Sequence, residues 1–126
     1  MNVTTLRLKP GAGPRASLLA HCVKHGVEAA CLLACVGSLE RAVIRSADAP
    51  DSTVLAGKLG LTLSGTLSRH GAHLHITVAD ADGRVRGGHL LDDSLVYTTA
   101  EIVLGILPGT FKRVFDPATG CLELEV

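Results

Sequence analysis

A strict two-residue alternation follows Lys58 and sets the character of the chain. From Leu59 to Ser64 a leucine alternates with glycine, threonine or serine. Side chains two residues apart share a face of an extended strand, whereas a helix needs apolar residues three or four apart. The pattern therefore predicts a strand with one buried face. Gly65, which follows it, predicts either a β-bulge or a close approach by another backbone.

The next segment predicts a β-hairpin whose register can be counted. The residues Asp80-Ala81-Asp82-Gly83 lie between two expected strands, 73–79 and 84–91. They fit a type I turn whose last residue is in the left-handed conformation. Such a loop pairs residue 80 with residue 84, and counting back places His75 opposite His89. Directly opposed residues project to the same face, with Cβ atoms about 5 Å apart.

Shorter patterns complete the expected fold. Pro14 suits the first turn of a helix that ends near His25, before Gly26. Thr99–Leu107 fits a strand, with a short helix as the alternative. Further strands are expected at 3–8, 27–36, 39–45 and 96–107, with a closing pair at 111–115 and 121–126. One helix among seven or more strands predicts an α+β fold, and 126 residues predict a single domain over residues 1–126.

Composition narrows the classes of function. The 12 basic and 12 acidic residues cancel, whereas proteins that bind nucleic acid usually carry a basic excess. The first nine residues lack the apolar segment of a signal peptide, and no apolar run approaches the ~20 residues that cross a bilayer. None of the four cysteines forms a CxxC pair. We therefore expect reduced thiols, a cytoplasmic location, no membrane partner and no direct binding of nucleic acid by the isolated domain.

Three histidines predict a metal site. His73 and His75 lie on one face of their strand, and the hairpin register adds His89 to that face. Three imidazoles can converge on one divalent, zinc-like ion at about 2.0–2.1 Å from each nitrogen. Gly87 and Gly88 leave room for a ligand or another backbone to approach beside His89. Three ordinary half-exposed strand histidines are the alternative.

Seven short motifs occur in order along the chain. They occupy residues 7–11, 36–39, 63–67, 73–75, 87–90, 98–101 and 116–120. Together they resemble the plants-and-prokaryotes-conserved (PPC) domain over nearly the whole chain, and Gly-Gly-His-Leu after His-x-His is the most specific part. Residues 11–14 depart from the family, which usually carries an acidic residue after the glycine.

The resemblance implies an α+β fold around an antiparallel sheet or partial barrel, with one or two helices. This fold is related to that of acetolactate decarboxylase, a zinc enzyme with a His-x-His motif and a third histidine. The family is usually assembled as a homotrimer. The resemblance also implies that His73, His75 and His89 lie together, in agreement with the count of the hairpin register.

Three functions are compatible with these features. The first is a PPC protein of unresolved activity that binds a divalent metal or small ligand through the three histidines. The second is a metal-dependent small-molecule enzyme of decarboxylase or hydrolase type. Its candidate catalytic residues are Glu101 and Asp116 as acid or base and Arg113 for an anionic substrate, although each also suits a surface ion pair. The third is a DNA-associated regulatory module, because plant members carry AT-hook segments; this chain has no Arg-Gly-Arg-Pro core.

Overall fold

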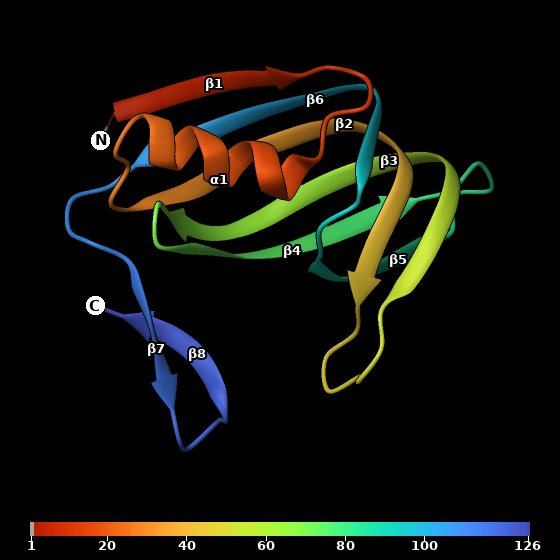
Figure 1. Ribbon diagram of the computed structural model, residues 1–126. Coiled ribbons are helices and arrows are strands. Elements are labelled where there is room, and N and C mark those ends of the chain that lie inside the picture. The colour runs from red at the N-terminus through yellow and green to blue at the C-terminus, as the bar shows by residue number, and fades with distance from the viewer. Residues whose placement is uncertain (1) are drawn as a thin grey trace.

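The computed structural model describes residues 2–126 and contains one helix and eight strands (Figure 1). In chain order the elements are β1 (Asn2–Leu8), α1 (Pro14–Lys24), β2 (Ala30–Arg45), β3 (Thr53–Ser68), β4 (Gly71–Ala79), β5 (Val85–Leu90), β6 (Leu95–Ile106), β7 (Lys112–Asp116) and β8 (Cys121–Glu125). The fold is α+β, as predicted. In the described part of the chain, no helix is long and apolar enough to cross a membrane.

Six strands form one antiparallel sheet in the order β1-β6-β2-β3-β4-β5. The long strand β2 pairs with β6 as far as Arg41, and its last residues then pair with β5. Ile44 lies opposite Leu90, and Arg45 lies opposite His89. This second pairing curls β2, β3, β4 and β5 into a partially closed ring at one end of the sheet.

The core lies on the inner face of the sheet, where α1 covers it (Figure 1). Leu18 and Cys22, one helical turn apart, are fully buried, whereas Val23 is 64% exposed. The leucines at positions 59, 61 and 63 are all buried, as their alternation predicts. Burying such aliphatic side chains stabilises the fold by about 1.5–3 kcal/mol each. The small and polar residues between them project outward.

The strands are longer and more irregular than the sequence predicts. Two strands were expected at 27–36 and 39–45, but both belong to the single strand β2. The register of β2 with β6 shifts between Leu32 and Ala34 and again around Leu39. These irregularities are β-bulges, and the strand continues through Gly37 and Ser38. The strand β3 begins at Thr53 instead of Lys58. Thr99–Leu107 is no helix, because residues up to Ile106 continue β6.

The strands β7 and β8 form the expected antiparallel pair, with Phe115 opposite Leu122. They make a separate two-stranded sheet and do not close the main one. Figure 1 shows this hairpin standing away from the sheet. The Phe115 side chain is 63% exposed and that of Leu122 is 64% exposed, so one apolar side of the hairpin is uncovered within the chain.

Candidate metal centre

The hairpin of β4 and β5 has the predicted register, with His75 opposite His89. Gly83 adopts a φ of 77°, the left-handed conformation that the turn requires. The Gly83 amide donates to the Asp80 carbonyl at 3.0 Å, and the Asp80 amide donates to the Arg84 carbonyl at 3.0 Å. The Asp80 carboxylate also accepts from the amides of Asp82 and Arg84 at 2.9 Å. These bonds fix the turn, and the turn fixes the histidines.

His73, His75 and His89 form one group on the outer face of the ring, and we call them the histidine triad. Their ring centroids are 4.8–5.4 Å apart in pairs. One nitrogen from each ring lies within 4.8 Å of the others. Tetrahedral coordination at about 2.0–2.1 Å needs donors about 3.4 Å apart. His73 and His75 are exposed and His89 is half-buried, so small side-chain rotations can close the difference. The triad therefore fits a divalent ion.

The surroundings of His73 and His89 favour neutral imidazoles, the form that binds metals. Burial lowers the pKa of His73 below 6.5, and the charges of His75 and Arg113 lower it further, against a smaller opposite effect of Glu123. Burial also lowers the pKa of His89, as do the charges of Arg45 and the two other triad histidines. His73 and His89 are consequently poor proton sites at neutral pH.

Arg113, predicted as an anion-binding residue, lies near the triad. Its guanidinium reaches from β7 to β3 and donates to the Thr66 hydroxyl at 2.8 Å. Thr66 is the register partner of His73, so Arg113 lies over the same face of the sheet. Glu123 of β8 is near enough to influence the pKa of His73. The sequence did not indicate Glu123 or Arg45, because neither the docking of the C-terminal hairpin nor the pairing of β2 with β5 has a local signal.

The other two candidate catalytic residues lie elsewhere in the chain. Glu101 lies on β6, opposite Arg7 of β1 and Val36 of β2. Asp116 ends β7 and accepts the Ala118 amide at 2.8 Å, so its carboxylate closes the turn of the C-terminal hairpin. Neither belongs to the triad within one chain, and the triad contains no carboxylate.

Gly87 and Gly88 serve close packing between backbones. A Cβ at Gly88 would lie 2.7 Å from the Arg45 carbonyl oxygen, and one at Gly87 would lie 2.8 Å from that of Ile76. Both distances are too short for a side chain. The two glycines thus allow β5 to sit between β4 and β2 and bring His89 to the triad. The sequence also predicts that a ligand can approach beside these two glycines, and this stays a prediction.

The fold and the triad define a class: an α+β domain that presents three convergent imidazoles on the outer face of an antiparallel sheet. Residues 1–108 match the family described as the Plants and Prokaryotes Conserved domain, abbreviated PCC or PPC. The chain belongs to this family. The resemblance inferred from the motifs is therefore confirmed.

The chain is 45% identical over 128 residues to the bifunctional protein GlmU of Synechococcus sp. (strain JA-3-3Ab). The match covers 100% of this chain and 21% of that protein. The chain thus spans about a fifth of the length of the curated relatives it matches. It corresponds to one segment of those proteins, and their complete activity is not implied by this match.

Three solved structures share the fold. A hypothetical protein from Salmonella cholerae-suis is 36% identical with a TM-score of 0.95, covering 98% of this chain and 91% of that one. A metal-containing protein from Archaeoglobus fulgidus is 26% identical with a TM-score of 0.87, covering 100% and 94%. A plant- and prokaryote-conserved (PPC) protein from Pyrococcus horikoshii is 21% identical with a TM-score of 0.81, covering 100% and 93%.

Proposed function

We propose that this PPC protein binds one divalent, zinc-like ion per chain through His73, His75 and His89. The observation that carries the proposal is the convergence of three imidazole nitrogens within 4.8 Å. Three neutral histidine ligands are a known zinc set, and an ion held by them supplies Lewis-acid chemistry at its open coordination position. The metal-containing relative from Archaeoglobus fulgidus supports the proposal.

The test is metal stoichiometry in untagged protein. Purified protein should bind about one zinc ion per chain, and His75→Ala should abolish binding because two ligands rarely suffice. His25→Ala is the matched control, since it removes an exposed histidine at the helix end, outside the triad, whose ring centroid lies 4.4 Å from that of His21. Elemental analysis and zinc titration give the readout. Unchanged stoichiometry in His75→Ala would rule out this site.

A metal-dependent small-molecule enzyme is the second candidate, and the position of Arg113 favours it. Its guanidinium is held by Thr66, the register partner of His73, so a fixed positive charge stands close to the triad. A planar guanidinium suits a carboxylate or phosphate of a substrate. Turnover of a small anionic substrate that a chelator abolishes would distinguish an enzyme from a binding module.

We also propose that the protein is a homotrimer in the cytoplasm. On the outer face of the sheet, Leu33 is 48% exposed and Val36 is 61% exposed, and the apolar side of the C-terminal hairpin is uncovered as well. Soluble monomers seldom expose apolar surfaces of this kind, and identical subunits would cover them. The PPC resemblance favours three subunits. Four free cysteines suit a reducing compartment.

A further inference from the structure

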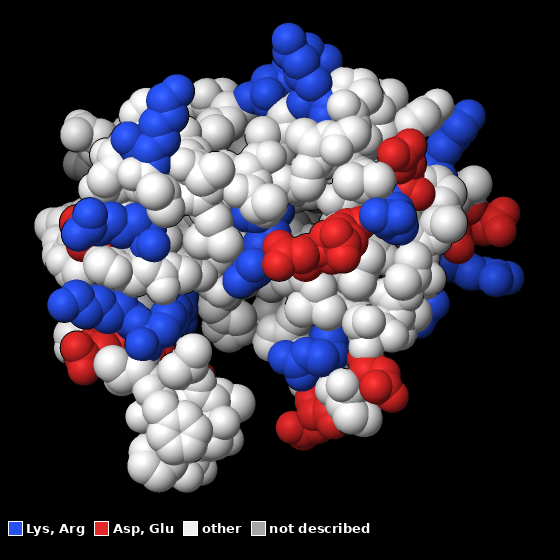
Figure 2. Space-filling model, in the orientation of Figure 1, with Lys and Arg blue, Asp and Glu red and all other residues white. Residues whose placement is uncertain are grey.

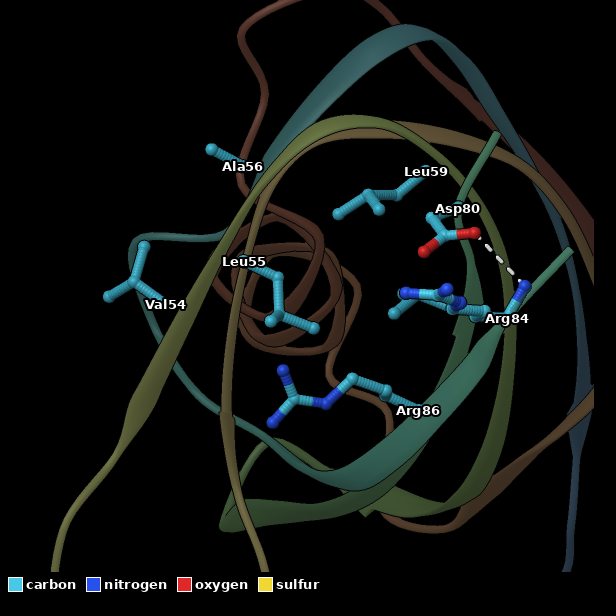
Figure 3. A pocket seen from close by; sticks show the side chains of 8 residues that line it. Val54, Leu55, Ala56, Leu59, Asp80, Arg84 and Arg86 are labelled. Carbon is cyan, nitrogen blue, oxygen red and sulfur yellow. Dashed lines mark hydrogen bonds between the residues drawn. The ribbon is translucent and has the colours of Figure 1, made fainter. Parts of the chain in front are cut away.

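The interior of the ring opens to solvent beside the turn between β4 and β5. A cavity of about 220 Å³ lies at this mouth. Its aliphatic walls include Leu55, Leu59 and Val78, and the charged residues Asp80, Arg84 and Arg86 complete the lining. Figure 3 shows Arg84 beside Asp80 and the guanidinium of Arg86 reaching toward Leu55. We call this cavity the ring mouth.

The register of β5 explains why arginines occupy an inner face. Arg86 lies opposite Val78, which is 2% exposed and belongs to the core. Opposed residues project to the same face, so Arg86 points into the ring, and Arg84, two residues earlier, shares its direction. His89 is an odd number of residues from both and projects to the outer face. The ring mouth and the triad therefore lie on opposite faces of one strand.

Neither arginine of the ring mouth has a partner within residues 2–126. The other six arginines, at positions 7, 15, 41, 45, 69 and 113, each donate to an oxygen of the chain. The nearby Asp80 carboxylate accepts backbone amides at the turn and makes no ion pair with either guanidinium. Two guanidiniums thus stand unpaired over an aliphatic wall.

We propose that the ring mouth binds a small aliphatic monoanion, of the class of short-chain carboxylates. Guanidinium groups bind planar oxyanions through paired N–H donors, which accounts for the anionic head. The leucine and valine walls account for an apolar tail. The volume is below the roughly 300–1,000 Å³ of sites for drug-sized ligands, so the tail is short.

A purely structural role would give the arginines a different behaviour. Arginine stems can cover the apolar end of a core while their charged heads stay in water. Such stems create no preference between a carboxylate and a neutral molecule with the same tail. The comparison of hexanoate with hexanol, made on the unmodified protein, separates the two roles without any variant.

The experiment titrates chelator-treated protein with hexanoate, butanoate, hexanol and inorganic phosphate, followed by calorimetry and amide chemical shifts. Hexanoate should bind saturably, with shifts centred on β5 and the start of β3. Each methylene should tighten binding about fourfold, the equivalent of about 0.8 kcal/mol. Arg84→Gln and Arg86→Gln should each weaken hexanoate binding at least about tenfold. Arg69→Gln is the matched control, because it removes the same charge at the opposite end of β4, where Arg69 pairs with Glu28.

Several results would overturn the proposal. One is that hexanoate shows no saturable binding at millimolar concentration. Another is that hexanol or inorganic phosphate binds with the same affinity as hexanoate. If Arg69→Gln weakened hexanoate binding as much as Arg86→Gln does, the effect would come from the overall charge of the protein and not from the ring mouth. Because metal is removed throughout, failure of the histidine triad to bind zinc leaves this result unchanged.

Discussion

In the proposed metal site, protons and metal ions would compete for the same nitrogens of the histidine triad. Burial and neighbouring charges lower the pKa values of His73 and His89 below 6.5, so protons compete less at a given pH. Zinc affinity should therefore fall as the pH drops through the lowered pKa values of His73 and His89. Zinc titrations at about pH 7.5 and about pH 5 check this expectation. Equal affinity at both would contradict the assignment of the ligands.

The sequence predicted the triad because its geometry is local. A turn of known type and two strands of fixed periodicity determine which residues face one another, so His75 and His89 could be paired by counting. Glu101 and Asp116 were selected only for their chemistry, and the structure separates them from the triad. Their positions depend on pairings between distant segments, for which a single sequence carries no register.

Gly65 makes the pairing of β3 with β4 possible. Its φ is 144°, and a Cβ there would lie 2.1 Å from the His73 carbonyl oxygen. The register is continuous at this point, so the glycine allows a close approach and forms no bulge. Gly65→Ala should lower the free energy of unfolding by about 2–4 kcal/mol through backbone strain and displacement of β4.

Gly60→Ala is the matched control on the same strand, because the nearest atom to its added Cβ is 4.0 Å away. It should change the free energy of unfolding by less than about 0.5 kcal/mol. Denaturant unfolding of both variants gives the comparison. Equal stability of the two variants would mean that β4 moves away from Gly65 without cost.

The limits of prediction at the scale of elements appear in β2. Gly37 and Ser38 are typical of a break between strands, and the two predicted strands flank them. A single strand instead passes through them. A Cβ at Gly37 would lie 2.1 Å from the Thr99 carbonyl oxygen of β6, so the close packing of β2 against β6 requires a glycine at this position. The glycine is there for a neighbour some 60 residues away in the sequence, which no local pattern reveals.

The exposed apolar surface of the whole chain leads to a prediction about mass. Outer-face side chains such as Val36 and hairpin side chains such as Phe115 are more than half exposed in the single chain. A homotrimer would bury them, so light scattering on the 13.0 kDa chain should report about three times that mass. A Phe115→Asp, Leu122→Asp double variant should shift the mass downward. A monomer of the unmodified protein at micromolar concentration would contradict the trimer.

The distribution of charge leads to a prediction about nucleic acid. Basic and acidic residues cancel over the whole chain, and Figure 2 shows both signs interspersed over one face. Neutralisation of phosphates, the main source of non-specific affinity, is therefore weak. We expect no appreciable duplex binding at physiological salt, measured by fluorescence anisotropy with an A·T-rich duplex. Submicromolar binding with a steep salt dependence would show that a local basic patch outweighs the overall balance.

The pairing of β1 with β6 has a consequence for synthesis on the ribosome. Val3 lies opposite Gly105, so β1 has no partner until the ribosome has made about a hundred further residues. At about 5–20 residues per second, that wait lasts roughly 5–20 seconds. Pairings between segments close in the sequence form faster than distant ones, so β3, β4 and β5 can assemble during the wait. The local pairs β2–β3 and β4–β5, the second of which carries the three imidazoles, would then form early, and β1 would be the last strand of the six-stranded sheet to be secured.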